Sequence, residues 1–342
     1  MKVLQNQDDF KTRLYREQST PLVRALAGRR LPRRLVGMRS NGFICGMLMY
    51  LVSGEFDVIE TIGHRPAFTY GLLCRLLGKK AAVHIGREFY LEDRPRTSIK
   101  SAVLECLYRY ALTSLDALVV NATGEIEPYA RSIGQPAAKV RFIAWPSNID
   151  EPRLIEGRGT YVFAAGSSLR DWTTFFEAVA DLGLPCVVVA SQNDIKGQKV
   201  PENVDLHLDV PYERYRALLE DARIVVVPLL KTQRSTGQSC FLEAMSYGKP
   251  VIAARVVGAV DYITEGFNGL YYRPGDCADL KEAISKLMGD EDLRRTLSAN
   301  GLASVGKTFN SGAYVEALFR MMGQLLESAS AGQGRTGAKK TA

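Results

Sequence analysis

From residue 157 onward, short runs of β-branched and other apolar residues alternate with longer amphipathic runs. Parallel βαβ units show this alternation, because each crossover helix covers a buried strand. We expect strands at residues 160–166, 185–191, 203–209, 223–229, 249–255 and 268–276. We expect helices at residues 171–183, 213–222, 239–248, 276–290, 291–301 and 312–327, with a short helix and turn at 257–266. The pattern predicts one complete doubly wound α/β domain.

The N-terminal half repeats the alternation less regularly, with strands expected at 2–6, 57–63, 80–86, 116–122 and 139–145. Its longest apolar run, residues 42–54, is shorter than the ~20 residues that span a bilayer and predicts a buried helix. Two Rossmann-like domains in tandem fit the 342 residues. We expect a first domain at 1–152, a linker at 151–160, a second domain at 160–308, a helix returning to the first domain at 309–327, and a disordered tail at 328–342.

The net charge of +7 belongs to the first half of the chain. Residues 1–156 contain 23 Lys and Arg against 16 Asp and Glu, whereas residues 157–342 contain 21 of each kind. The arginines gather in a stretch without acids: Arg24, Arg29, Arg30, Arg33, Arg34 and Arg39. Charge alone admits nucleic-acid binding, but no basic stretch interleaved with aromatic residues supports it. The six cysteines form no Cys-x-x-Cys pair, which favours buried thiols in a reducing cytoplasm over disulfides or a metal site.

Ligands of open parallel sheets bind at the carboxyl ends of the strands, where helix amino ends present backbone N–H groups. The first such place follows the strand at 160–166. Gly166 allows a tight turn there, and Arg170 can bind a phosphate through two charge-assisted hydrogen bonds. Alternatively, Arg170 and Asp171 form a surface pair at the start of a helix.

The second place follows the strand at 223–229. Gly237, Gln238 and Ser239 open a helix, so their amides are expected to face a phosphate. Glu243 lies about one turn further on, where its two acceptor oxygens suit the two hydroxyls of a ribose. The loop residues Lys231 and Arg234 add positive charge. The alternative is an ordinary buried helix with an exposed glutamate.

A third place is the turn around Gly258, which can bring backbone near the same ligand. Asp261 and Glu265 would start and end a short helix there, more as scaffold than as chemistry.

From Gly237 to Leu287 the chain carries Glu-Ala-Met, Gly-Lys-Pro-Val-Ile, Asn-Gly-Leu and Pro-Gly-Asp in sequence. In order and spacing, this run resembles the donor-binding half of the family-4 retaining glycosyltransferases, which have the GT-B fold. The resemblance covers residues 55–308 and includes Pro-Ser-Asn-Ile-Asp at 146–150, similar to the family's interdomain crossing.

The resemblance implies two Rossmann-like domains facing a cleft, in which a nucleotide-diphosphate sugar binds against the second domain. It implies transfer with retained configuration and without a metal or cofactor. Glu243 matches the residue that holds the donor ribose, and Arg170 falls near the phosphate-binding arginine. Gly237, Gln238 and Ser239 match the backbone around the diphosphate, and Gly166 and Lys231 complete the expected donor site.

Three departures accompany this resemblance. Ser235 occupies the place of the first glutamate of the family's Glu-x7-Glu motif, and Asp171 replaces the phosphate lysine. Residues 5–10 replace the Gly-Gly loop after the first strand. Ser235 is nevertheless the expected catalytic position in the second domain. In the first domain, the expected catalytic residues are His64, in the turn that follows the strand at 57–63 and is expected to face the cleft, and Glu88, because Arg87 and Glu88 stand where the family often has a histidine followed by an acid.

The other two histidines, His84 and His207, lie in expected strands and are interpreted as structural. The leading functional hypothesis is a transferase of polysaccharide biosynthesis that acts on a glycan or lipid-linked acceptor. A non-catalytic GT-B subunit that binds a nucleotide sugar or a partner enzyme is the alternative, and a GT-B epimerase ranks lower.

The arginine-rich segment 24–39 falls on the acceptor domain, where Leu26, Leu31, Leu35 and Val36 are interleaved with the arginines. It predicts a cytoplasmic protein that associates peripherally with an anionic membrane surface. The alternative is a plainly solvated basic face.

Overall fold

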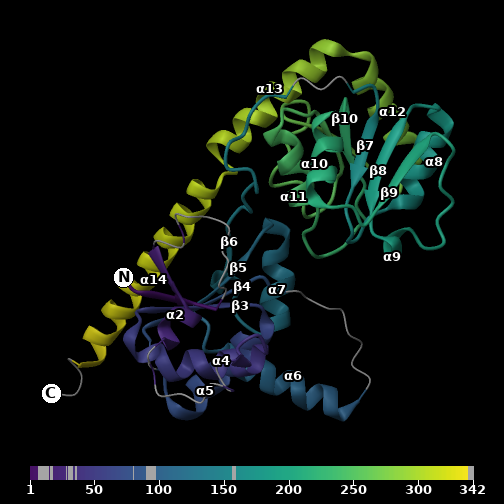
Figure 1. Ribbon diagram of the computed structural model, residues 1–342. Coiled ribbons are helices and arrows are strands. Elements are labelled where there is room, and N and C mark those ends of the chain that lie inside the picture. Colours follow the sequence, from purple (N-terminus) through teal and green to yellow (C-terminus); the bar gives the residue numbers. More distant parts are fainter. Residues whose placement is uncertain are drawn as a thin grey trace. The chain divides into compact units, whose positions relative to one another are not determined.

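The computed structural model describes residues 1–6, 15, 18–27, 29, 34, 37–79, 81–89, 98–155 and 159–337. The chain divides into two compact units (Figure 1). Unit 1 consists of Met1–Val120, Glu125–Ile143 and Val315–Ala342, and unit 2 consists of Asn121–Gly124 and Ala144–Tyr314. Each unit contains one six-stranded sheet whose neighbouring strands are parallel. The two Rossmann-like sheets expected from the sequence are confirmed.

The sheet of unit 2 has the order β12-β11-β10-β7-β8-β9. Its strands are β7 (Val162–Ala165), β8 (Cys186–Ala190), β9 (Val204–Leu208), β10 (Ile224–Val227), β11 (Val251–Ala254) and β12 (Leu270–Tyr272), all within the expected ranges. Its helices are α8 (Trp172–Leu182), α9 (Gln192–Ile195), α10 (Tyr212–Glu220), α11 (Gln238–Ser246), α12 (Cys277–Gly289) and α13 (Glu291–Lys307). Helix α8 packs against α12, and α11 packs against α13. The strands β7, β10 and β11 are buried along their whole length, which explains their unbroken apolar runs.

Residues 257–266 form turns, so the expected short helix is wrong. Asn268 supplies the reason, because its side chain takes the hydrogen bonds that a helix would make. Its Oδ1 accepts from the backbone N of Thr264 at 2.7 Å, and its Nδ2 donates to the carbonyl of Tyr262 at 3.0 Å. Gly258 packs its backbone against the loop before α11, since a Cβ there would meet the backbone N of Thr236 at 2.5 Å.

The sheet of unit 1 has the order β2-β1-β3-β4-β5-β6. Its strands are β1 (Val3–Gln5), β2 (Ser19–Pro21), β3 (Val58–Ile62), β4 (Val83–Arg87), β5 (Ala117–Val120) and β6 (Val140–Phe142). Only β2 was not expected from the sequence. Its helices are α2 (Leu22–Leu26), α4 (Gly42–Val52), α5 (His64–Leu77), α6 (Ile99–Leu112), α7 (Ile126–Ile133) and α14 (Ser311–Gly337), the last belonging to unit 1 from Val315 onward.

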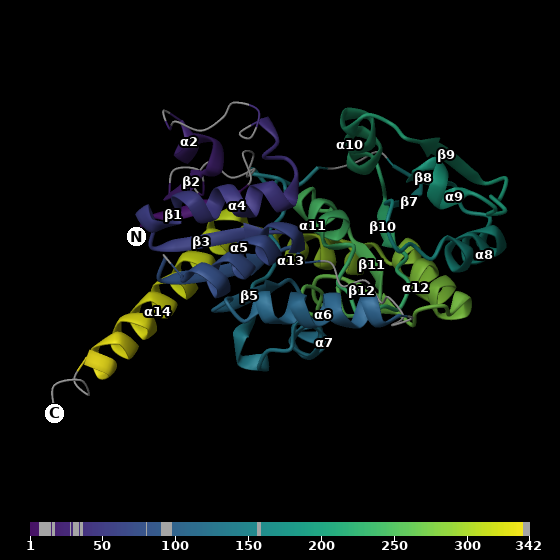
Figure 2. The ribbon, with the colours of Figure 1, turned by 90° about the horizontal axis from the view of Figure 1, so that it is seen from below.

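Helix α4 is the expected buried helix, and it lies beside α5, which in turn packs on α6 (Figure 2). Two glycines allow α4 to approach the first turn of α5 closely. A Cβ on Gly42 would meet Cβ of Arg65 at 2.7 Å, and one on Gly46 would meet the carbonyl oxygen of Pro66 at 2.5 Å. The amino ends of α4 and α5 are therefore held next to each other.

Helix α14 packs on unit 1 by placing Phe319 against Tyr15, with ring centroids 5.8 Å apart. It continues past Glu327, where the sequence predicts its end. The hydroxyls of Ser328 and Ser330 support the extension by donating to carbonyls one turn earlier, at 2.9 and 3.0 Å. Residues 338–342 of the expected tail lie outside the described residues.

The arginine-rich segment is only partly described. Arg24 and Arg34 are exposed, whereas Arg29 pairs with Glu55 at 2.5 Å. Leu26 is buried. Seven residues of the segment lie outside the described part of the chain: Gly28, Arg30, Leu31, Pro32, Arg33, Leu35 and Val36. All six cysteines are free thiols, and Cys106 is exposed, which corrects the expectation that it is buried. Within the described ranges, no helix is long and apolar enough to cross a membrane.

Candidate functional site

The strand order of unit 2 creates a topological switch point between β7 and β10, because the chain leaves these neighbours toward opposite edges of the sheet. Open α/β sheets bind ligands at such a point, outside the carboxyl ends of the strands. The loops that follow the two strands are joined here. The backbone N of Leu230 donates to the carbonyl of Leu169 at 3.0 Å, and that of Asp171 donates to Pro228 at 3.1 Å.

Arg170 folds back over the end of β7. Its Nε donates to the carbonyl of Ala165 at 3.0 Å, and a second guanidinium nitrogen lies 3.1 Å from Sγ of Cys240 on α11. Gly166 makes this possible, since a Cβ there would meet the guanidinium at 2.1 Å. Asp171 caps α8 by accepting from Thr174 N at 3.1 Å, so the alternative of an Arg170–Asp171 surface pair is wrong. Arg170 is a cation held by neutral acceptors beside the start of α11.

Helix α11 begins without a side-chain cap among the described residues. Its N-cap, Gly237, has φ of 89°, a conformation that glycine adopts without strain. The next residue, Gln238, is buried, and its Nε2 has no hydrogen-bond partner within the described structure. Ser239 and Lys231 are exposed. The first-turn amides of α11 therefore form the kind of helix end that binds anions.

Ser235 lies in the loop that leads to α11, and Gly258 packs against it: a Cβ on Gly258 would be 3.2 Å from Cα of Ser235. Arg234 reaches the other loop, where its guanidinium lies 3.3 Å from Oγ of Ser168. The expected donor residues of the two loops thus lie at the same switch point.

Glu243 is buried, so the alternative of an ordinary helix with an exposed glutamate is wrong. Its Oε2 accepts from the hydroxyl of Tyr215 at 2.9 Å, and its Oε1 accepts from Tyr212 at 3.2 Å and from Asn148 Nδ2 at 3.4 Å. Burial, with the carboxylate beside them, raises the pKa of both tyrosines. Both hydroxyls therefore stay protonated and act as donors. Sequence reasoning missed these partners, although the three-residue spacing of the tyrosines places them on one helix face.

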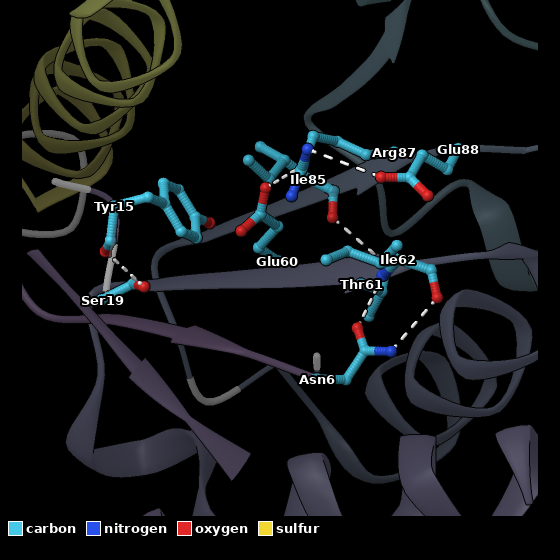
Figure 3. Close-up of polar contacts among 9 residues, drawn as sticks. All are labelled: Asn6, Tyr15, Ser19, Glu60, Thr61, Ile62, Ile85, Arg87 and Glu88. Carbon is cyan, nitrogen blue, oxygen red and sulfur yellow. Dashed lines mark hydrogen bonds and ion pairs between the residues drawn. The ribbon is translucent and has the colours of Figure 1, made fainter. Parts of the chain in front are cut away.

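Unit 1 has its own switch point, between β1 and β3. Asn6 joins the two strand ends: its Nδ2 donates to the carbonyl of Ile62 at 3.1 Å, and its Oδ1 accepts from the same residue's N at 2.6 Å (Figure 3). A cavity of about 440 Å³ lies here. Its lining includes the expected His64 and Glu88 together with Arg39 and Arg65, which sequence reasoning did not assign.

Arg87, which precedes Glu88 in the chain, is not among the described residues that line this cavity. Its guanidinium is buried, bonds through Nε to Glu60, and lies over the ring of Tyr15 at 5.7 Å (Figure 3). Burial raises the pKa of Glu60, and Arg87 opposes that shift. Glu88 follows with φ of 54° and its carboxylate 3.8 Å from the guanidinium. The sequence did contain a signal for this pair. Glu60 is a charged residue within the otherwise apolar strand expected at 57–63, and a buried charge of this kind needs a partner.

His84 is fully buried between the hydroxyls of Thr61 and Ser114, at 3.0 and 2.9 Å, which confirms its structural interpretation. Burial and the charge of Lys79 hold the pKa of His84 well below its ordinary value. His207 lies on β9 with Nε2 3.0 Å from Asp205, away from both switch points in sequence. Within the described residues, no group of three or more His, Cys, Asp or Glu side chains is placed to hold a metal ion.

Residues 189–303 match the family model described as Glycosyl transferases group 1. An uncharacterized glycosyltransferase of Methanocaldococcus jannaschii is 24% identical over 261 residues, which cover 72% of this chain and 70% of that protein. A capsular polysaccharide biosynthesis glycosyltransferase of Staphylococcus aureus is 34% identical over 96 residues, or 28% of this chain and 25% of its own length. The residues matched by the family model lie in unit 2.

The architecture also has solved counterparts. The crystal structure of HepE of Anabaena in complex with UDP-glucose aligns with 97% of this chain and 100% of its own, with a TM-score of 0.63 and 15% sequence identity. This likeness concerns the fold, which has two parallel sheets with flanking helices. The chain therefore has the GT-B fold and carries a glycosyltransferase group 1 domain in its C-terminal region.

Proposed function

We propose that the protein transfers a sugar from a nucleotide-diphosphate sugar to a glycan or lipid-linked acceptor, with retained configuration and without a metal. The observation that carries this proposal is the switch point of unit 2, where Arg170 lies beside the uncapped start of α11. A guanidinium and helix amides together suit a diphosphate. The UDP-glucose bound to HepE, which shares the fold, supports a donor of this class.

In this proposal the amides of Gly237, Gln238 and Ser239 bind the diphosphate, and Lys231 adds charge from the neighbouring loop. Glu243 accepts the ribose hydroxyls: Oε2 can accept one bond in addition to that from Tyr215, and at Oε1 a ribose hydroxyl takes the place of the long bond from Asn148. The donor is thus held at both its phosphates and its ribose.

Catalysis then rests on the leaving group. Arg170 and the α11 amides stabilise the charge that develops on the departing diphosphate, and preorganised donors of this kind lower a barrier strongly. Ser235 hydrogen-bonds the sugar but supplies no negative charge. On the acceptor side, His64 and Glu88 share one cavity, where either can accept the proton of the attacking hydroxyl.

Ser235 also favours a second candidate, a non-catalytic subunit that binds a nucleotide sugar or a partner enzyme. The two candidates agree on donor binding and differ on turnover. If the purified protein transfers sugar and Arg170→Gln abolishes that transfer, the non-catalytic subunit is excluded.

A thermal-shift screen with UDP-, GDP-, ADP- and TDP-sugars tests the donor, because a ligand that binds only the folded state stabilises it by RT ln(1 + [L]/Kd). We expect one nucleotide class to raise the melting temperature, and Arg170→Gln to remove that shift. Arg295→Gln is the matched control, since Arg295 pairs with Glu291 on α13 and both side chains are exposed. Absence of any shift in the wild type contradicts the proposed function.

We further propose that the protein acts at the cytoplasmic surface of an anionic membrane, in polysaccharide biosynthesis as the name of the staphylococcal relative suggests. Besides the basic segment 24–39, α6 exposes Val103, Leu104 and Leu107 near the exposed Lys100. Apolar side chains next to lysine suit an interface with anionic lipid. Flotation with phosphatidylglycerol vesicles, but not phosphatidylcholine vesicles, is expected, and Leu104→Ser should reduce it.

A further inference from the structure

We propose that the cavity at the switch point of unit 1 binds a phosphate or diphosphate group of the acceptor. The proposal rests on the proposed function, because it names the acceptor class of that reaction. The cavity of about 440 Å³ opens where β1, β3 and β4 end, and residues from all three strand ends or the positions that follow them line it: Asn6, Ile62 and Glu88. Open α/β sheets bind ligands outside the carboxyl ends of the strands at a switch point, so this cavity lies where a ligand of unit 1 is expected.

The charge of the lining favours an anion. Arg39, His64 and Arg65 contribute basic groups, whereas Glu88 is the acid among the lining residues that the structure describes. The Glu88 carboxylate lies 3.8 Å from the buried guanidinium of Arg87, so part of its charge is already balanced. Two guanidinium groups suit the terminal oxygens of a phosphate, since each can donate two parallel hydrogen bonds.

The backbone adds to the same field. Gly42 and Gly46 hold the amino ends of α4 and α5 together, so two helix dipoles point their positive ends at one place. Asn41 caps α4 by accepting from Phe43 N at 3.0 Å. Helix α5 begins instead after Gly63, whose φ is 88°, and no side chain among the described residues caps it.

Unit 2 repeats this construction at its own switch point. Helix α11 also follows a glycine with φ near +90° and also has no side-chain cap within the described structure, and an arginine lies beside its first turn. In contrast, α8, α12 and α13 carry the aspartate caps Asp171, Asp276 and Asp290. The two glycine-started helices thus lie at the two switch points. If one receives the donor diphosphate, the chemistry of the other suits a second phosphorylated group.

Histidine NMR offers a direct test, because the sequence has only three histidines. Inorganic pyrophosphate is titrated into protein labelled with 13C at the imidazole Cε1, in an Arg170→Gln background that weakens the donor site. We expect the His64 signal, assigned by its loss in His64→Gln, to shift saturably. The signals of buried His84 and of His207 should stay in place.

Arg65→Gln is expected to weaken the pyrophosphate affinity at His64 by about 10-fold or more, since hydrogen bonds to charged groups contribute ~1.5–3 kcal/mol. Arg131→Gln, on the exposed face of α7 in the same unit, is the matched control and should leave the affinity unchanged. A His64 signal that does not shift overturns the proposal. Equal affinities in Arg65→Gln and Arg131→Gln also overturn it.

Transfer assays identify the source of the phosphate. A soluble hexose phosphate and a short-chain prenyl diphosphate sugar in micelles are compared as acceptors, and preferential use of one names the class. For that acceptor, Arg65→Gln should raise KM while the donor Kd stays constant. Transfer to uncharged sugars alone overturns the phosphate proposal and leaves the transferase standing. If no nucleotide sugar binds, the proposed transferase function is contradicted. The His64 titration with pyrophosphate still tests whether the unit 1 cavity binds an anion.

Discussion

Tyr215 donates its hydroxyl to Oε2 of Glu243 over 2.9 Å, while its stacked neighbour Tyr212 donates to Oε1 over 3.2 Å. The two rings lie 5.8 Å apart and 29° from parallel. The carboxylate proposed to hold the donor ribose is therefore oriented by α10 before any nucleotide arrives. Preorganisation of this kind lowers the entropic cost of binding.

Tyr215→Phe should lower the free energy of unfolding by about 1–3 kcal/mol, because it leaves a buried carboxylate oxygen without its donor. Tyr212→Phe is the control. The Tyr212 side chain is 50% exposed, so water can replace its hydroxyl and the loss should be under about 1 kcal/mol. Urea denaturation monitored by circular dichroism measures both. Equal losses would contradict a special role for the Tyr215 bond.

Glu243→Gln should weaken binding of the nucleotide sugar by about 10-fold or more, since an amide offers one acceptor oxygen and no charge to the two ribose hydroxyls. Isothermal titration with the nucleotide found in the thermal-shift screen measures the change. Glu213→Gln on the exposed side of α10 should leave the Kd as it is. Unaltered binding in Glu243→Gln would remove Glu243 from the donor site.

Gly166→Ala should displace Arg170, because the new Cβ would occupy the place of the guanidinium, 2.1 Å away. We expect a loss of ~1–3 kcal/mol in stability and a clear loss of nucleotide affinity. Gly183→Ala separates strain from displacement: Gly183 also has positive φ, but nothing lies within 4 Å of a Cβ there. It should lose about 1 kcal/mol of stability and retain full affinity.

Glu60→Ala should reduce the free energy of unfolding by ~3–5 kcal/mol, because it removes the buried carboxylate that pairs with the buried guanidinium of Arg87. The double variant Glu60→Met with Arg87→Met should recover much of that loss, since apolar residues of similar volume replace buried pairs well. Denaturant titration of the single and double variants gives the coupling. A double variant less stable than Glu60→Ala would show that the pair is needed as a pair.

The free energy of unfolding should fall as the pH drops below about 6.5, the ordinary pKa of histidine. His84 stays neutral in the folded state because its pKa is well below that value, whereas the unfolded chain takes up a proton there. The unfolded state then binds more protons, which costs up to ~1.4 kcal/mol per pH unit. Between pH 5 and 6.5, His84→Gln should flatten this slope and His207→Gln should not. If the pH dependence of the free energy of unfolding is unchanged in His84→Gln, groups other than His84 cause it.

Strands were predictable because parallel strands buried on both faces require unbroken apolar runs, as in Ile224–Val227. Strand β2, Ser19–Pro21, has no such run and pairs only with β1, so no local pattern identifies it. The short helix expected within 257–266 does not form, because the local structure depends on Asn268, whose side-chain bonds cannot be inferred from helical periodicity.

The candidate sites divide in the same way. Gly166, Arg170 and Gly237 follow strands and could be placed from sequence, because a strand end fixes where the next residues lie. Tyr215 and Arg65 could not be assigned, since their positions depend on how one helix packs beside another segment far away in sequence. That Arg87 is the ion-pair partner of Glu60 could not be inferred either, because the two residues lie on different strands.

Helix α14 gives unit 1 a particular order of assembly. Most of unit 1 leaves the ribosome first, yet Phe319, which packs on Tyr15, is made after the whole of unit 2. The contact between Tyr15 and Phe319 can therefore form only after the whole of unit 2 has been synthesised. A fragment ending at residue 143 would lack that contact, so we expect it to be less stable than unit 1 with α14.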